Sequence, residues 1–104
     1  MDDALRSVAD PTRRAILRLL RHGEVAAGTI AREFPGMSRP AVSQHLRILY
    51  DAGLVEIRPD GNRRLYRLRP DGFAEAAAFL DEMWSAGLDR LKAVAEQTAR
   101  QEQA

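Results

Sequence analysis

A break at residues 35–37 constrains this 104-residue chain more than any other feature of its sequence. Before the Pro-Gly-Met break, residues 27–34 have the pattern of a short helix with Ile30 and Phe34 facing inward. After it, residues 38–52 carry apolar side chains at spacings of four and three, as a helix with one buried face does. Since so short a break leaves room only for a tight turn, the sequence predicts a helix-turn-helix unit.

The start of the second helix of this unit is ambiguous by one residue. Ser38 has the better side chain for capping free amides, whereas Pro40 disfavours helical geometry at Arg39. Gly53 is the expected end of the helix. Its buried stripe consists of Val42, Leu46 and Leu49.

Helical signals also precede this unit. Asp10 can cap a helix whose first residue is Pro11, where no amide donor is needed. An apolar stripe within residues 16–20 follows, and Gly23 is the expected end of that helix. A further short helix is indicated by Ala4, Leu5 and Val8.

A β-hairpin is predicted after the helix-turn-helix unit. Val55 and Ile57 alternate with charged residues, and the turn sequence Pro-Asp-Gly-Asn follows at 59–62. Tyr66 and Leu68 then share one face of a returning strand. Residues near 59–65 would form an exposed wing.

One long helix, about 40 Å at 1.5 Å per residue, is predicted over residues 71–98. Residues 99–104 are expected to be frayed. Because 104 residues are too few for two comfortable cores, we expect a single domain over 1–98 and a frayed tail over 99–104. The apolar stripe of the long helix consists of Phe73, Ala76, Ala77, Leu80, Met83, Trp84, Gly87, Leu88, Leu91, Val94 and Ala95.

The net charge of +1 conceals an uneven distribution along the chain. Residues 38–69 carry seven arginines against three acids, which gives +4, whereas residues 70–104 carry three basic groups against seven acids, which gives −4. This asymmetry indicates a segment that faces a polyanion beside one that avoids it.

The outward face of the helix over 38–52 has side chains suited to reading DNA. Arginine pairs with two acceptors of guanine, glutamine reads adenine, and serine contacts bases or phosphates. No acid lies between Arg39 and Tyr50, although a helix face selected only for solubility would be expected to include Glu or Lys. The outward residues are Arg39, Ala41, Ser43, Gln44 and Arg47, with His45 near the flank, where it could instead pack against the turn.

The wing offers a second contact. Arg63 and Arg64 follow a flexible turn and could reach a phosphate or the minor groove. Arginines also protect an exposed edge strand from aggregation, so the hairpin alone leaves both interpretations open. Beside a helix suited to DNA, contact with DNA is the favoured interpretation.

Other classes of protein are disfavoured by what the sequence lacks. Catalysis needs a nucleophile, a tuned base or a metal in a pocket. The chain has no cysteine and no Gly-rich phosphate loop, and Ser38 and Ser43 lack a plausible triad. No apolar run is long enough to cross a bilayer. We therefore expect a cytoplasmic protein that is neither an enzyme nor bound to a membrane, with no cofactor.

Four stretches carry a family resemblance. They are residues 5–17 (LRSVADPTRRAIL), 37–49 (MSRPAVSQHLRIL), 52–55 (AGLV) and 62–68 (NRRLYRL). Over about residues 5–69 their order and spacing resemble those of the ArsR/SmtB-type winged-helix repressors.

The resemblance implies a fold that is mainly α with a small β-hairpin, namely a winged helix-turn-helix with a long C-terminal dimerisation helix. It implies a homodimer that represses transcription by binding double-stranded DNA at a near-palindromic operator. It further implies contact to bases or phosphates by Ser38, Arg39, Ser43, Gln44 and His45, with Arg63 and Arg64 on the wing.

The metal site of many relatives does not match this chain. The usual thiolate pair would fall at Ala26 and Gly28, which cannot ligate a metal, and the last helix contains no histidine. We therefore expect the metal-independent branch of the family. The sequence does not specify an inducer, and it leaves activation open beside repression.

The long C-terminal helix is expected to pair with a second copy of the chain, because its stripe is too wide to bury against one winged helix. Trp84 would be the central anchor, and Gly87 would permit close approach of the partner helix. In the alternative interpretation, Trp84 caps the core of the monomer. The predicted interface consists of Leu5, Phe73, Leu80, Met83, Trp84, Leu88 and Leu91.

A winged helix that binds protein instead of DNA is the alternative function. Such a module would be expected to carry acids on the helix over 38–52 and an uncharged wing, and this sequence has the opposite features.

Overall fold

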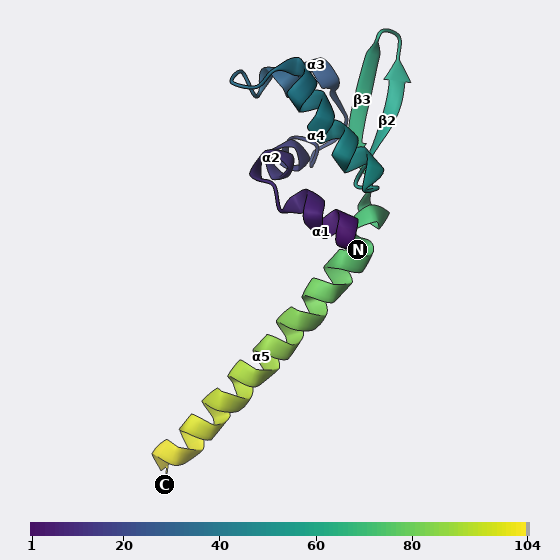
Figure 1. Ribbon diagram of the computed structural model, residues 1–104. Helices are drawn as coiled ribbons and strands as arrows, with labels where there is room; N and C mark the ends of the chain where they lie inside the picture. The colour runs from purple at the N-terminus through teal and green to yellow at the C-terminus, as the bar shows by residue number, and fades with distance from the viewer. Residues whose placement is uncertain (104) are drawn as a thin grey trace.

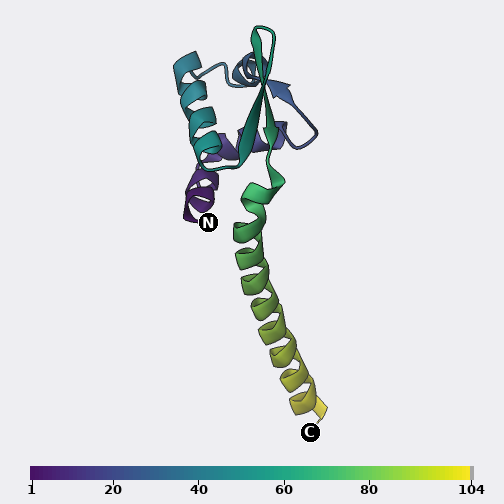
Figure 2. The same cartoon turned by 90° about the vertical axis from the view of Figure 1, so that its right-hand side faces the viewer.

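The computed structural model describes residues 1–103, and Ala104 lies outside the described residues. Helices and a small sheet form a compact winged unit, from which one long helix projects (Figure 1). Figure 2, turned by 90°, shows the same separation from the side. The described chain therefore measures 72 × 28 × 23 Å.

Side-chain caps begin the two helices whose starts the sequence marked. The Asp10 carboxylate accepts a hydrogen bond from the Arg13 amide at 3.0 Å. The Ser38 hydroxyl accepts one from the Ala41 amide at 3.2 Å, so Ser38 is the cap and Arg39 the first helical residue. The helices of the winged unit are α1 (Asp2–Val8), α2 (Pro11–Leu19), α3 (Ala27–Arg32) and α4 (Arg39–Asp51).

The predicted hairpin consists of β2 (Val55–Asp60) and β3 (Arg63–Leu68), which pair antiparallel. Gly61 supplies the positive φ of 60° that the first position of a two-residue hairpin turn favours. The sequence analysis missed a third strand, β1 (Val25–Ala26), which pairs with β3 and makes the order β1-β3-β2. Two residues are too few to show an alternating pattern, so only the tertiary pairing reveals β1.

The core of the winged unit joins all of its helices to the sheet. The predicted stripe of α4 is buried, with Leu49 fully enclosed. Ile16 from α2 and Ile30 from α3 are likewise inaccessible to solvent. Burial of side chains of this size stabilises a fold by about 1.5–3 kcal/mol each. The core therefore holds α4 with one face inward and the other exposed.

Two helix ends differ from the sequence prediction. Helix α2 ends at Leu19, because Leu20 turns into the core instead of continuing the helix towards Gly23. Helix α5 (Ala74–Gln103) follows a 3₁₀ turn at Pro70–Phe73. It continues beyond Thr98, where the prediction ended it, since residues 99–103 contain Ala, Arg, Gln and Glu, which favour helix.

Helix α5 packs little of its length against the winged unit. Among its described residues only Ala76 is buried, and Trp84 and Leu91 are each 66% exposed. The sequence prediction that one winged helix cannot cover the stripe is therefore confirmed for the single chain. No helix within residues 1–103 has both the length and the apolar character needed to cross a membrane.

A close backbone contact sets where α5 leaves the winged unit. A Cβ atom at Gly72 would lie 1.8 Å from the backbone oxygen of Gly53 and 2.8 Å from its carbonyl carbon. The neighbouring Arg69 amide donates to the Leu54 carbonyl at 2.9 Å. Only glycine permits this approach at position 72, so the contact fixes the root of α5 against the end of α4.

Gly72→Ala should destabilise the protein by about 1–3 kcal/mol, because the new methyl group forces the two backbone segments apart. Urea unfolding followed by circular dichroism measures the change. Gly36→Ala is the matched control and should be close to neutral, since a Cβ there meets no atom within 4 Å. Equal stability of the two variants would contradict a packing role for Gly72.

Candidate nucleic-acid interface

The exposed face of α4 and the wing together line one hollow of about 580 Å³. Ser43, Gln44 and Arg47 contribute from α4, and Arg64 contributes from β3. All four side chains are exposed, as the sequence predicted. Helix α4 and the wing therefore present these four predicted contact residues to the same hollow.

Tyr50 belongs to this hollow and was missed by the sequence analysis. It is 48% exposed, next to Asp51 and one turn after Arg47. Its position, seven residues after Ser43, puts the two side chains on one helix face. That spacing was the signal that could have identified it.

Arginines of the wing differ in how they are paired. Arg63 donates to the Asp60 carboxylate at 2.7 Å, and this hydrogen bond lowers the pKa of Asp60. Arg64 has no ion pair among the described residues. In α4, Arg47 donates to both carboxylate oxygens of Asp51 at 3.1 Å. Of these three guanidinium groups, that of Arg64 is left without an acidic partner in the described chain.

A bidentate ion pair anchors the base of the wing. The Arg58 guanidinium donates to the two oxygens of Glu24 at 2.9 and 3.0 Å. The hydrogen bond from Arg58 lowers the pKa of Glu24, and Glu24 in turn raises the pKa of Arg58. The pair joins β2 to the segment just before β1, so both sides of the small sheet are held together.

His45 is turned towards α2. Its Nδ1 lies 3.4 Å from Arg13 Nη1 and 3.9 Å from the Asp10 carboxylate, and the side chain is only 20% exposed. Arg13 also donates to the carbonyl oxygens of Ser7 and Arg6. Because a guanidinium can only donate, Nδ1 is the acceptor in this contact. These contacts favour the packing interpretation that the sequence left open for His45.

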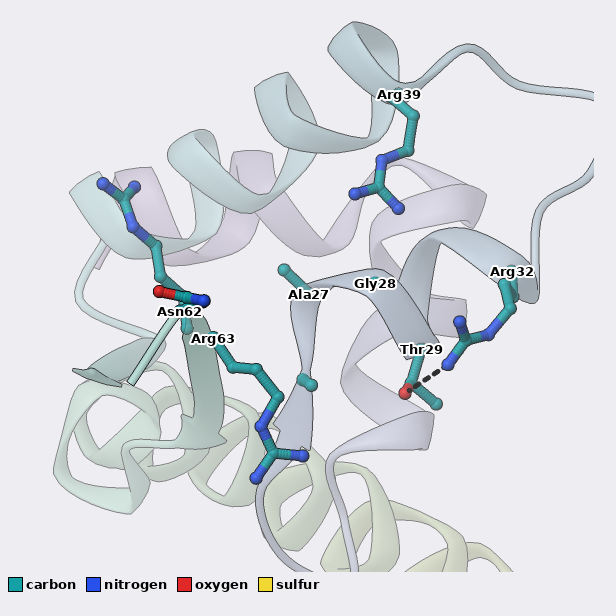
Figure 3. Close-up of a pocket in the computed structure, with 9 residues that line it drawn as sticks. Ala27, Gly28, Thr29, Arg32, Arg39, Asn62 and Arg63 are labelled. Carbon is teal, nitrogen blue, oxygen red and sulfur yellow. Dashed lines mark hydrogen bonds between the residues drawn. The ribbon is translucent and has the colours of Figure 1, made fainter. Parts of the chain in front are cut away.

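A second hollow, of about 450 Å³, lies between α3, the start of α4 and the wing. Figure 3 shows Arg32, Arg39 and Arg63 arranged around the first turn of α3. Arg39 is thus placed apart from Ser43 and Gln44, in a different hollow. The sequence analysis missed Thr29 and Arg32. Residues three apart lie on the same face of a helix, and because Ile30 faces inward, this pair could have been placed on the outward face.

The residues predicted for the dimer interface fall into two groups. Leu5 and Phe73 are half-buried and pack against the core of their own chain. Those from α5 are exposed, namely Leu80, Met83, Trp84, Leu88 and Leu91. Phe79 and Val94 are also exposed large apolar residues of α5, and neither was in the predicted interface.

The segment where many relatives place thiolates has no ligating side chain here. Ala26 precedes α3 and Gly28 lies in its first turn. Within residues 1–103, no three His, Asp or Glu side chains are grouped so as to hold a metal ion.

Comparison with known proteins identifies the family. A model described as a helix-turn-helix domain matches residues 8–58. The HTH-type transcriptional regulator Rv2034 of Mycobacterium tuberculosis is 51% identical over 84% of this chain and 80% of its own length. The arsenical resistance operon repressor of Escherichia coli is 35% identical over 90% of this chain and 80% of its own.

A solved structure, that of a possible transcriptional regulator for arsenical resistance, is 49% identical. It has a TM-score of 0.73 and covers 88% of this chain and 94% of its own. The chain belongs to the ArsR family. It is therefore a winged helix-turn-helix transcriptional regulator that binds DNA, not an enzyme. The ArsR/SmtB resemblance and the winged helix-turn-helix fold predicted from sequence are confirmed.

Asp10→Ala should lower the stability of this ArsR-family protein by about 1 kcal/mol at neutral pH, because it removes the cap of α2. Asp10→Asn, which can still cap, should retain most of the stability. Chemical unfolding of the three proteins measures the differences.

The effect of Asp10 should also depend on pH. The amide of Arg13 lowers the pKa of Asp10 below its value in the unfolded chain, which is about 3.9. The carboxylate's contribution is thus fully present above that value and is lost as the pH falls through the folded-state pKa. The difference between wild type and Asp10→Ala should shrink below about pH 4. If the stability difference between wild type and Asp10→Ala stayed constant down to acidic pH, the negative charge of Asp10 would not contribute to capping.

Proposed function

We propose that this ArsR-family regulator is a cytoplasmic homodimeric repressor that binds a near-palindromic operator and does not sense metal through the usual thiolate site. The exposed apolar stripe of α5 is the observation that carries the proposal. Over its 30 residues this helix buries only Ala76 among those described, while Trp84 and Leu91 are each 66% exposed. An apolar surface of this extent on a small domain is characteristic of an interface.

A second copy of α5 is the partner that fits this stripe. The apolar residues recur at helical spacing, whereas Glu82 and Asp89 lie on the opposite face of the helix. Pairing two stripes buries them and leaves these acids in solvent. Residues 70–104 carry a net charge of −4, so the paired helices favour a position away from DNA phosphates.

Two-fold symmetry then relates the two DNA-binding faces. Copies of α4 about 34 Å apart reach successive major grooves on one side of the duplex. A symmetric protein favours a symmetric site, which is why we expect a near-palindromic operator. Within each half-site we assign base contacts to Ser43 and Gln44. These neighbouring residues line the hollow between α4 and the wing described above, which we call the helix–wing hollow.

The remaining predicted contacts are assigned to the DNA backbone. Arg64 has an exposed guanidinium without an acidic partner in the described chain, which suits a phosphate. Ser38 is occupied as the cap of α4, and Arg47 is held by Asp51. Their polar groups are thus already engaged within the protein, which makes them less suited than Ser43 and Gln44 to reading bases.

Trp84→Ala should weaken dimerisation at least about 30-fold, because truncation of a central aromatic anchor costs 2 kcal/mol or more. Sedimentation velocity over a dilution series measures the dimer, and the same samples are tested for DNA binding. Glu82→Ala is the matched control on the opposite face and should remain dimeric. A Trp84 variant as dimeric as wild type would refute the proposed interface.

Gln44→Ala and Arg64→Ala should weaken DNA binding in different ways. Wild-type protein first selects its operator from a random duplex library, and the enriched site should be near-palindromic. Loss of Gln44 should then cost about 1–3 kcal/mol on that site and little on shuffled DNA. Loss of Arg64 should weaken both and reduce the salt slope by about 1.

If loss of Gln44 instead weakened binding to both DNAs and loss of Arg64 weakened binding only to the selected site, Gln44 would be the phosphate contact and Arg64 the base contact. An enriched site without internal symmetry would contradict the homodimeric repressor.

A further inference from the structure

The hollow between α3, the start of α4 and the wing is strongly basic. We call it the basic pocket; it is lined by Ala26, Ala27, Gly28, Thr29, Arg32, Arg39, Asn62, Arg63 and Arg64. Among these residues are four arginines and no acid. Its residues come from β1, α3, α4 and the wing, so their proximity is a product of the tertiary fold (Figure 3).

Most of the positive charge in the basic pocket is not neutralised by the protein. Arg39 and Arg64 have no ion pair or side-chain hydrogen bond within residues 1–103. Arg32 donates to the neutral Thr29 hydroxyl at 3.1 Å. Only Arg63 has an acidic partner, namely Asp60, which is not one of the residues that line the pocket. Four guanidinium groups and one carboxylate leave a local formal charge of +3.

The residue types of the basic pocket suit a small oxyanion. The Arg39 guanidinium lies against the start of α3, because a Cβ atom at Gly28 would be 3.7 Å from Arg39 Nη1. In Figure 3, Arg32 and Arg63 lie on opposite sides of the start of α3, and Arg32 is turned towards Thr29. Guanidinium groups match phosphate oxygens with two parallel hydrogen bonds, and Thr29 and Asn62 offer further polar groups.

We infer that the basic pocket is a phosphate-binding site, which shares Arg64 with the helix–wing hollow, and that Arg32 of α3 is its distinguishing residue. The phosphate can come from the DNA backbone or from a free phosphorylated molecule that competes with DNA for the regulator. This inference deepens the proposed function, since a backbone phosphate held here extends the interface from α4 and the wing to α3.

The test compares full-length wild type with Arg32→Ala and Arg32→Lys. Calorimetric titration with inorganic pyrophosphate at low salt measures the free-anion source. Anisotropy titrations of the selected operator over a range of salt concentrations measure the backbone source. Arg100→Ala removes the same charge near the far end of α5 and is the matched control. Thermal melting confirms that each variant is folded.

We expect wild type to bind pyrophosphate saturably and Arg32→Ala to bind it at least 10-fold more weakly. Arg32→Ala should also reduce the salt slope of operator binding by about 1, as loss of one phosphate contact does. Arg32→Lys should have a pyrophosphate affinity between those of wild type and Arg32→Ala, because lysine keeps the positive charge but lacks the planar guanidinium group.

The two measurements separate the sources. A changed salt slope without pyrophosphate binding supports the DNA backbone alone, and lost pyrophosphate binding with unchanged operator binding supports a free phosphorylated molecule alone. Wild-type behaviour of Arg32→Ala in both measurements overturns the site and leaves the proposed function intact. If wild type selects no operator, the proposed function fails, and the pyrophosphate titration still decides the pocket.

Discussion

Burial of one face of α4 is the interaction on which the rest of this structure depends. Val42 and Leu46 are each 2% exposed and Leu49 is fully enclosed, so the helix cannot rotate without exposing its apolar stripe. Because the stripe is fixed inward, Ser43 and Gln44 are fixed outward. The same core that stabilises the winged unit therefore also orients the face to which we assign the base contacts.

The arginines of the sheet and of α4 differ in whether an acidic side chain pairs with them. Acids hold Arg58 through Glu24, Arg67 through Glu56 and Arg63 through Asp60. Those pairs lie along the small sheet and stiffen the wing. Exposed pairs of this kind contribute little stability, about 0–1 kcal/mol each, so their value lies more in placing side chains. Among the arginines of α4 and the wing, Arg39 and Arg64 are left without an acidic partner within residues 1–103.

The long helix α5 has an apolar face that its own chain does not cover. Its root is fixed by the contact of Gly72 with Gly53, and its N-terminal end lies beside α1, where the chain's amino group is 3.6 Å from Glu75. Beyond this root, the described part of α5 has almost no support from its own chain. The direction of the helix is thus set inside the monomer, while its apolar face is left for another chain in the proposed dimer.

Local signals in the sequence determined most of the elements and the family. Asp10 and Ser38 marked helix starts, Gly61 marked the hairpin turn, and the period of Leu46 and Leu49 marked the buried face of α4. These signals are readable because capping, turn conformation and periodicity act within a few residues. The same locality explains why the outward face of α4 could be predicted from sequence.

Only the tertiary structure decided which distant residues meet. It paired β1 with β3, turned His45 towards Asp10, and put Arg32 of α3 and Arg39 of α4 in the lining of one pocket. No local pattern encodes these contacts, because they depend on how the elements pack around the shared core. The sequence therefore determined the family and the exposed face of α4, whereas packing alone decided that α3 shares a basic pocket with α4 and the wing.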